Sequence, residues 1–430
     1  MNVPYTFHAN LFLRAPVKKL TQNLSQNFQL EKLLGDKEFL EAVFLASPVL
    51  HAALLKYAAG EMVAEKEVKK LQLSLAKYYL RMGSRCTPFG LFSGCAVAKW
   101  SANTTAVEIS EHYRHTRFDM HYLCALAQHL STLPFIKNKL LYFPNSSFYK
   151  LGNEIRYVEY KYNNGKRQHL ITAVAASDYV LAILKHSENG ITIDAIIHLL
   201  VSDEIDIIEA TDFLAELIES QLLVNELEPA VTGDEFLYQI ITTLKNLPID
   251  NNNELNTIIN LLETLEKSLH NIDTSKNYSI EIYKNIITLI EQFNIPFDES
   301  KLFQTDLSFS LLEKTVNISH QNEITETLGI INKLNSVSEN TTLIAFAKKF
   351  YERYENTEMP LLQVLDTETG IGYLEKKDNA IMPLIDDVAV MGKVSDEHKI
   401  IWSKKDKYLL QKLTAALIQN NYSVELNEDE

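Results

Sequence analysis

The stretch Arg81-Met-Gly-Ser-Arg-Cys-Thr-Pro-Phe-Gly-Leu-Phe-Ser-Gly94 joins the end of a predicted helix to a glycine-rich loop. Upstream of it, apolar side chains recur at the spacing of one buried helical face, at Leu71, Leu75, Tyr78 and Met82. We expect Gly83 to end this helix in the left-handed conformation, which glycine adopts without a steric cost. Pro88 lacks a backbone N–H and prevents the helix from resuming. The sequence therefore predicts a buried helix that delivers a tight loop.

Two arginines stand four residues apart at the end of this helix, Arg81 and Arg85. Guanidinium groups keep their charge at any working pH and bind oxyanions through several donors. The Thr87 hydroxyl and backbone N–H groups near Gly90 add further donors, as in an anion-binding nest. The pattern indicates an anion site. An alternative interpretation stays open, in which both arginines pair with surface carboxylates.

The same string, written Arg-x-x-x-Arg-x-Thr-Pro-Phe-Gly-Leu-Phe-x-Gly, resembles the N-terminal signature of the class I lanthipeptide dehydratases, the lantibiotic dehydratase family. A second string in residues 359–373, Pro-Leu-Leu-x-Val-Leu-Asp followed by Gly-Ile-Gly, is similar to the same family. The resemblance implies that glutamate moves from glutamyl-tRNA to Ser and Thr hydroxyls of a ribosomally made precursor peptide. Elimination of the resulting ester then leaves a dehydroamino acid.

The composition agrees with a globular chain of two to three domains. The 430 residues are 46% hydrophobic and 23% charged. The N-terminus has no basic start followed by an apolar segment, and no apolar run is long enough to cross a membrane. Three cysteines without metal-ligand spacing fit a reducing compartment. We expect a cytoplasmic protein, with membrane association only through a biosynthetic complex.

The charge is unevenly distributed along an acidic chain of net charge −15. Residues 1–100 hold 13 Lys and Arg against 7 Asp and Glu, whereas the remainder holds 28 against 49. A basic N-terminal part can attract a polyanion locally. The alternative is that these basic residues only cover helices.

The resemblance also implies roles for three further residues of a glutamyl-transfer site. Arg14 ends a predicted strand over residues 5–14, and the resemblance implies that it helps to bind the glutamyl donor. The alternative is a solvated arginine at a strand end. Asp119 belongs to the string Arg-Phe-Asp-Met-His-Tyr-Leu. It either caps the N-terminus of a helix or forms an ion pair with Arg81 or Arg85. Asp306 lies in a predicted strand at 302–310. A buried aspartate there would need a cation as its partner, which Arg81 or Arg85 would supply. The alternative is an exposed aspartate on an edge strand.

We predict an α+β fold of mixed helices and small antiparallel sheets, in three parts. Residues 1–144 form an N-terminal glutamylation subdomain with the arginine motif, and residues 229–430 form its α+β continuation. Residues 145–228 read as three strands, three helices and a short closing strand, with a hairpin turn at Asn163-Asn-Gly165. This order is typical of a winged helix-turn-helix.

The third helix of this module, residues 205–221, carries five carboxylates and no lysine or arginine, which disfavours binding to duplex DNA. The resemblance instead implies a leader-peptide recognition element, in which the leader adds as a strand beside the third strand and packs against the third helix. The candidate peptide-binding residues are Gln168, Leu170, Thr172, Ile208, Thr211 and Leu214. The alternative is that the apolar ones are module core.

The expected partners are glutamyl-tRNA and the precursor peptide. No metal ligands and no cofactor are predicted. No covalent enzyme intermediate is predicted either, because no Cys-His or Ser-His-Asp arrangement is visible. Family members with both activities are about twice this length or more, so the remaining transfer and elimination regions are further expected partners, together with a cyclase and a second copy of the chain. We expect either an N-terminal piece of a longer protein, inactive or incomplete alone, or a split form. The alternative function is binding of leader peptide or tRNA without catalysis.

Overall fold

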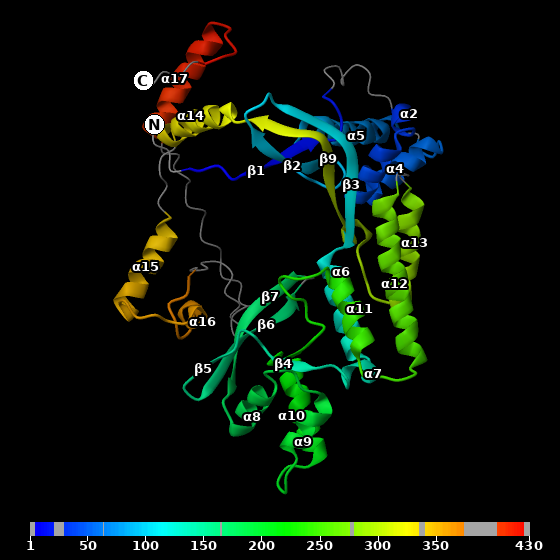
Figure 1. Ribbon diagram of the computed structural model, residues 1–430, viewed down its shortest axis with the longest axis vertical. Coiled ribbons are helices and arrows are strands. Elements are labelled where there is room, and N and C mark those ends of the chain that lie inside the picture. Colours follow the sequence, from blue (N-terminus) through cyan, green and yellow to red (C-terminus); the bar gives the residue numbers. More distant parts are fainter. Residues whose placement is uncertain are drawn as a thin grey trace. The chain divides into compact units, whose positions relative to one another are not determined.

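A computed structural model describes residues 5–20, 30–62, 64–163, 166–275, 279–334, 340–373 and 402–424. The chain separates into two units, one of residues 7–320 and one of residues 1–6 with 321–430. Mixed helices and small sheets make the fold α+β, as expected (Figure 1). None of the described helices is long and apolar enough to cross a membrane.

The strands of residues 7–320 form three sheets, with orders β1-β2-β9-β3, β4-β8 and β5-β6-β7. Their bounds are β1 Asn10–Pro16, β2 Ser93–Ser101, β3 Ala106–Phe118, β4 Tyr142–Pro144, β5 Tyr149–Leu151, β6 Glu154–Asn163, β7 Lys166–Ala175, β8 Leu223–Asn225 and β9 Phe303–Asn317.

The helices of the same unit lie between β1 and β9 in the sequence. Their bounds are α2 Leu30–Leu33, α3 Lys37–Ala46, α4 Pro48–Ala58, α5 Glu65–Ser84, α6 Met120–Thr132, α7 Pro134–Lys137, α8 Asp178–His186, α9 Ile193–Leu200, α10 Ile207–Glu219, α11 Phe236–Asn246, α12 Asn253–Thr274 and α13 Ile280–Ile290.

The four-stranded sheet is mixed, which corrects the expectation of antiparallel sheets. Strand β9 lies between β2 and β3, parallel to β2 and antiparallel to β3. Strand β1 runs antiparallel to β2 and continues to Pro16, beyond the expected end at Arg14. The order of strands in this sheet depends on β9, which comes about two hundred residues after β2 in the chain. Local sequence patterns do not predict such a distant pairing.

One face of this sheet is covered and the other is open. Helices α3, α4 and α5 bury one face in a core that contains Phe39, Leu54, Leu75, Met82, Phe92 and Phe309. Along β9 the side chains of Thr305, Leu307 and Phe309 are buried, and the alternate residues are exposed or half-buried. Alternation of this kind is expected when helices cover one face of a sheet and leave the other free.

Helix α5 passes through Gly83 and ends at Ser84, so the expected left-handed end at Gly83 is wrong. Arg85 caps the helix with an extended backbone, at φ −108°. Gly83 is buried where the chain before α2 crosses the helix: the Lys18 N–H donates to the Met82 carbonyl at 2.9 Å. A Cβ at Gly83 would lie 3.2 Å from the Lys19 carbonyl oxygen. The glycine therefore permits a close backbone approach rather than a turn.

Gly94 on β2 packs closely against β9, and its replacement is expected to destabilise the sheet. A Cβ there would lie 2.8 Å from the Leu307 carbonyl oxygen and 2.9 Å from the Phe309 ring. Because the Leu307 carbonyl belongs to the backbone of β9 and cannot retreat without moving the sheet, Gly94→Ala is expected to lower the free energy of unfolding by about 1–3 kcal/mol.

The matched control for this prediction is Gly35→Ala, whose Cβ would meet only the Lys32 carbonyl oxygen at an ordinary 3.7 Å. Chemical denaturation of both variants measures the difference. If Gly94→Ala were as stable as Gly35→Ala, the prediction would be wrong, and the strands would be able to move apart at Gly94 without loss of stability.

Residues 145–228 contain the expected secondary structure: the strands β5, β6 and β7, the helices α8, α9 and α10, and then β8, which pairs with β4. The predicted hairpin joins β6 to β7, and its turn residues 164–165 lie outside the described residues. The designation as a winged helix-turn-helix, and the domain boundaries 1–144, 145–228 and 229–430, stay predictions.

Helices α11, α12 and α13 follow this module. Figure 1 shows α12 and α13 side by side as a hairpin. Their apolar faces join α6 and the module in the larger core, through residues such as Leu126, Ile240, Leu262 and Ile286.

The second unit contains α14 Ser319–Leu334, α15 Thr341–Tyr354, α16 Leu361–Leu365 and α17 Lys404–Ile418. Asp366 is fully buried after α16 and accepts hydrogen bonds from the Glu368 and Thr369 N–H groups and the Thr369 hydroxyl. Arg353 donates to the Thr369 and Gly370 carbonyls, at 2.7 Å each. The second family-like string therefore builds a turn.

Candidate functional site

The loop between α5 and β2 is held in place at one end of the four-stranded sheet. The Phe92 N–H donates to the Phe89 carbonyl at 3.0 Å, and Gly90 between them has φ +49°, a conformation that favours glycine. The buried Ser93 hydroxyl donates to the Thr87 carbonyl. Thr87 is exposed on this loop. The Pro-Phe-Gly sequence thus fixes the path of the backbone beside Arg85.

Arg81 has an unusual environment in the last turn of α5. Its guanidinium lies over the Phe89 ring, 4.4 Å from the ring centre. Its Nε atom is buried and has no hydrogen-bond partner among the described residues. A buried, unpaired donor on a cation has a high cost unless a ligand satisfies it. Arg85 is exposed at the end of the same helix.

Arg14 and Asp306 lie on the open face of the sheet. Cross-strand pairing places Arg14 opposite Cys95, and Cys95 opposite Ser308, which is two residues from Asp306 on β9. Side chains on directly paired residues point to the same face of a sheet. Neighbouring strands are about 4.8 Å apart, so Arg14 and Ser308 are about 10 Å apart across the face. Arg14 is exposed there.

The ion partner of Asp306 is Arg117, not Arg81 or Arg85 as expected. Arg117 Nη1 and Asp306 Oδ2 are 2.8 Å apart, and the two side chains are 28% and 57% exposed. The two residues lie on the adjacent strands β3 and β9. Arg117 is directly opposite Gln304, and Asp306 is two residues from Gln304 on the same face of β9, so the two side chains are diagonal neighbours. Asp306 is neither buried nor on an edge strand.

A histidine lies on the same face. His115 is the direct cross-strand neighbour of Asp306, and its Nε2 is 3.0 Å from Glu235 Oε1. The sequence analysis did not select His115 or Arg117 as site residues. Period-2 alternation in β3 was the available signal, but it was hidden because Arg114 and Thr116, on the covered face, are polar as well.

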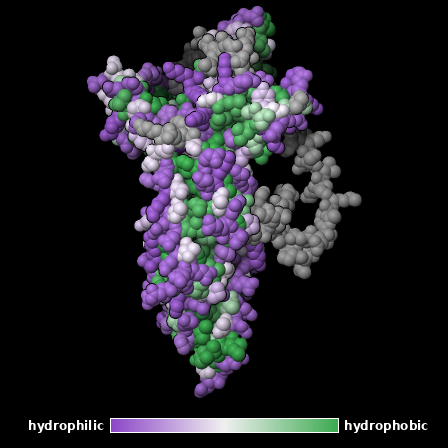
Figure 2. Space-filling model, turned by 90° about the vertical axis from the view of Figure 1, so that its right-hand side faces the viewer, coloured by the Kyte–Doolittle hydropathy of each residue, from purple (hydrophilic) through white to green (hydrophobic). Residues whose placement is uncertain are grey.

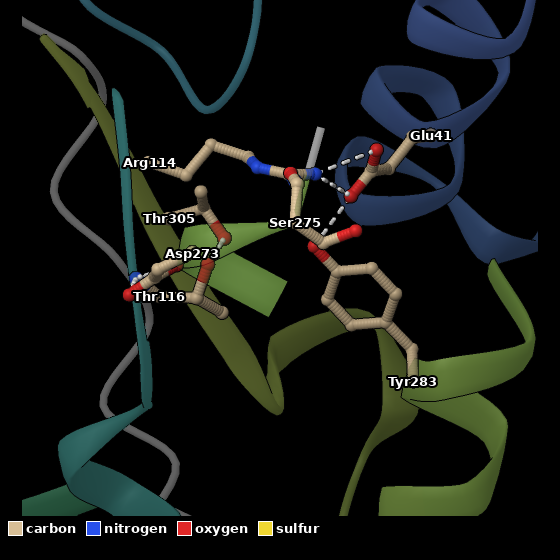
Figure 3. A network of polar contacts seen from close by, with 7 residues as sticks. All are labelled: Glu41, Arg114, Thr116, Asp273, Ser275, Tyr283 and Thr305. Carbon is tan, nitrogen blue, oxygen red and sulfur yellow. Dashed lines mark hydrogen bonds and ion pairs between the residues drawn. The ribbon is translucent and has the colours of Figure 1, made fainter. Parts of the chain in front are cut away.

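The covered face of β3 carries a polar network that joins the sheet to α3 and to the α12–α13 hairpin (Figure 3). Arg114 Nη1 contacts both Glu41 carboxylate oxygens, at 2.8 and 3.0 Å, and its Nη2 donates to the Ser275 carbonyl. The Tyr283 hydroxyl donates to Glu41 Oε1 at 2.8 Å. Burial raises the pKa of the Glu41 carboxyl and of the Tyr283 hydroxyl.

A second part of the network holds the outer edge of β3. Both carboxylate oxygens of Asp273 accept the Thr116 N–H, at 3.0 Å each, and the Thr305 hydroxyl donates to the Thr116 hydroxyl at 3.3 Å. Burial raises the pKa of the Asp273 carboxyl. The edge strand thereby gains a partner from α12, which satisfies a backbone donor that would otherwise be unpaired. The network fixes β3, and so it fixes Arg117 and His115 on the opposite face.

Asp119 acts as the N-cap of α6, which was one of its two expected roles. Its carboxylate accepts the His121 N–H at 2.9 Å. Its backbone N–H donates to the Leu302 carbonyl at 2.8 Å, just before β9 begins. Asp119 therefore links α6 to the strand that carries Asp306.

The expected peptide-binding residues fall into two groups. Gln168, Leu170 and Thr172 are half-buried on β7, which is an outer strand of its sheet. On α10, Ile208 is 71% exposed and Thr211 is exposed. Leu214 is only 1% exposed and packs in the larger core, so its side chain belongs to the core rather than to a binding surface.

Exposed apolar side chains gather at the end of α9 and the start of α10, and hydrophobic surface is visible at the lower end of the molecule in Figure 2. The residues concerned are Leu199, Val201, Ile207 and Ile208. No group of three or more His, Cys, Asp or Glu side chains able to hold a metal ion is found among the residues with described positions.

Residues 35–430 match the family model described as "Lantibiotic dehydratase, N terminus". The chain belongs to the lantibiotic dehydratase family. Among curated relatives, the subtilin biosynthesis protein SpaB of Bacillus subtilis is 25% identical over 87% of this chain and 36% of its own length. The nisin biosynthesis protein NisB of Lactococcus lactis subsp. lactis is 26% identical over 80% of this chain and 34% of its own length. This lantibiotic dehydratase chain thus spans little more than a third of such relatives.

Solved structures show the same fold. The tRNA-dependent lantibiotic dehydratase MibB from Microbispora sp. 107891 superposes with a TM-score of 0.73 at 20% identity, over 98% of this chain and 39% of MibB. The glutamylation domain TbtB from thiomuracin biosynthesis, bound to 5′-phosphodesmethylglutamycin, gives a TM-score of 0.55 at 16% identity, over 90% of this chain and 47% of that one. The family prediction is therefore confirmed, and the lantibiotic dehydratase fold extends over nearly the whole chain.

Proposed function

We propose that this chain is the N-terminal part of a catalyst that transfers glutamate from glutamyl-tRNA to Ser and Thr hydroxyls of a precursor peptide. The open face of the four-stranded sheet is the proposed transfer site. The observation that carries the proposal is the register that brings Arg14, Asp306 and Arg117 onto this one face, where Asp306 and Arg117 form an ion pair. The fold shared with the tRNA-dependent lantibiotic dehydratase MibB supports it.

The groups on this face match the charges of the substrate. The glutamyl group carries a side-chain carboxylate and a free α-ammonium, and its ester develops an oxyanion during acyl transfer. Arginine side chains suit the carboxylate and the oxyanion, and the exposed Asp306 carboxylate suits the ammonium. In the reaction the peptide hydroxyl attacks the ester carbonyl, the bond to the tRNA ribose oxygen breaks, and the hydroxyl proton passes to that oxygen.

Arg81 and Arg85 are the proposed contacts for phosphate or acyl oxygens at the end of the tRNA. The unpaired, buried Nε of Arg81 supports this assignment, because it is a donor without an acceptor among the described residues. Thr87 is placed on the same loop. Asp119 acts in this proposal by positioning the start of α6.

Transfer is tested by incubating the complete protein with precursor peptide and tRNA charged with labelled glutamate. We expect label to appear on the peptide as an ester, and to be released by mild base. Label that stays on tRNA while both substrates bind would favour the alternative function, a protein that binds leader peptide or tRNA without catalysis.

Leader binding at residues 145–228 is the second part of the proposal. The module is proposed to be a winged helix-turn-helix, and β7 offers an outer edge to which an extended leader can add as a strand. Gln168, Leu170 and Thr172 on β7, and Ile208 and Thr211 on α10, stay the predicted contacts. The other predicted partners are the remaining transfer and elimination regions, a cyclase and a second copy of the chain.

Ile208→Ser is expected to weaken leader binding about 10-fold, because a side chain that is 71% exposed would lose its burial in the complex. The control is Val231→Ser, a fully exposed apolar residue outside the module's helices. Fluorescence anisotropy with a labelled leader measures both. Equal affinity of the two variants would remove α10 from the proposed leader site.

A further inference from the structure

The outer half of the open sheet face differs from the rest of this acidic protein. Strands β1 and β2 contain no aspartate or glutamate, although the whole chain has a net charge of −15. Strands β3 and β9, in contrast, carry Glu108, Glu111, Asp306 and Glu313. A polyanion approaching the open face therefore meets the least repulsion over β1 and β2.

An exposed aromatic residue stands in the middle of this acid-free surface. Phe12 is 75% exposed on β1, and its direct cross-strand neighbour Val97 on β2 is 50% exposed. Burial alternates along β1, so Phe12 shares the open face with Arg14. A large apolar side chain in this position loses contact with water only when a partner covers it.

Two cations flank Phe12 on the same face. Arg14 is two residues further along β1, a distance of about 7 Å, and Lys99 is opposite Asn10 on the other side. Neither Arg14 nor Lys99 has a hydrogen bond or an ion pair with any residue that the structure describes. An aromatic ring between two unpaired cations, with no carboxylate on either strand, is the composition of a surface that binds single-stranded nucleic acid.

We propose that Phe12, supported by Val97, is the stacking platform for the base at the single-stranded 3′ end of the tRNA, with Arg14 and Lys99 contacting the adjacent phosphates. This inference rests on the proposed function and adds to it a recognition element for the RNA part of the substrate. Stacking on Phe12 places the terminal ribose, which carries the glutamyl ester, above the centre of the sheet near β9. The aromatic ring acts without reading sequence, because every base presents a flat face.

The test compares equilibrium binding of glutamyl-tRNA to the full chain and to Phe12→Ala, Phe12→Tyr and Phe12→Leu variants, at salt concentrations from about 50 to 200 mM. We expect Phe12→Ala to weaken binding by about 5- to 150-fold at each salt concentration. Phe12→Tyr keeps the stacking surface and should bind within about twofold of the parent. Phe12→Leu, apolar but not aromatic, should bind like Phe12→Ala.

Two controls separate stacking from the other contacts. Leu312→Ala removes a comparably exposed apolar side chain (67%) on β9 and should leave binding unchanged. Arg14→Ala should lower the slope of log affinity against log salt by about one, whereas Phe12→Ala should leave that slope unchanged. With tRNA that lacks its 3′-terminal nucleotide, the parent chain and Phe12→Ala should have the same affinity. The comparison is a double-mutant cycle, in which removal of one partner of a contact removes the effect of changing the other.

The inference is overturned if Phe12→Ala binds glutamyl-tRNA as well as the parent, or if Phe12→Leu binds as well as Phe12→Tyr. It is also overturned if the effect of Phe12→Ala persists with the shortened tRNA, or if only the affinity for precursor peptide falls. Tight binding by the parent with no effect of Phe12 would leave the proposed function intact. Failure of the parent chain to bind glutamyl-tRNA would contradict both.

Discussion

Arg114→Met is expected to lower the free energy of unfolding by about 3–5 kcal/mol at neutral pH, because it leaves a buried carboxylate without its cation. The Arg114 and Glu41 side chains are only 6% and 1% exposed. The Tyr283 hydroxyl is a neutral donor and cannot replace the lost charge. Chemical denaturation of the parent and the variant measures the loss.

The pH dependence identifies the cause of this loss. Burial raises the pKa of the Glu41 carboxyl above its ordinary 4.5, and the charge of Arg114 opposes that rise. Without Arg114 the folded-state pKa rises further, whereas the unfolded value does not change. Between these two values the folded state binds more protons than the unfolded state, so stability falls as pH rises through this window. The deficit of Arg114→Met should therefore be smallest near pH 5 and grow toward neutral pH.

Two further variants control this experiment. Adding Glu41→Gln to Arg114→Met removes the unpaired charge and should recover part of the lost stability. Lys69→Met breaks an ion pair with Glu65 whose side chains are 72% and 82% exposed, and should change stability by no more than about 0.5 kcal/mol. A deficit for Arg114→Met that is independent of pH and is not relieved by Glu41→Gln would attribute the loss to packing alone.

Asp306→Asn is expected to slow glutamyl transfer by about 100-fold without lowering stability. In the proposed site this carboxylate holds the α-ammonium of the glutamyl group, and an amide of the same shape lacks the negative charge. Stability should stay within about 0.5 kcal/mol, because the pair with Arg117 is partly exposed, at 28% and 57%. The measurement is the initial rate of ester formation on the peptide in the complete protein.

The matched control is Glu313→Gln, which removes one exposed carboxylate from the same strand, seven positions further along β9. Its rate should equal that of the parent. Equal rates for Asp306→Asn and Glu313→Gln would remove Asp306 from the transfer site.

Features set by local sequence were predicted correctly. The 3.6-residue spacing of apolar side chains in α5 and the capping residue Asp119 each depend on neighbours within one or two turns of chain. The family was also recognised, because its string at residues 81–94 is long and specific.

Features set by distant parts of the chain were not predicted. Strand β9 inserts between β2 and β3, and this pairing determines that Asp306 meets Arg117 instead of Arg81 or Arg85. Gly83 looked like a helix end, but the close approach of the backbone at Lys18 and Lys19 explains the glycine. In each case a contact between segments far apart in sequence decides the role of the residue.

The central claim, that this region holds the acylated end of a tRNA, is tested most directly by the salt dependence of glutamyl-tRNA binding. The parent chain is compared with the Arg81→Ala/Arg85→Ala double variant at low and physiological salt. We predict salt-sensitive binding that the double change weakens at least about 10-fold, with a shallower salt slope. Equal affinity of the parent chain and the double variant for glutamyl-tRNA, or no binding by the parent chain, would contradict the claim. Leader binding by residues 145–228 would then be the only proposed function left.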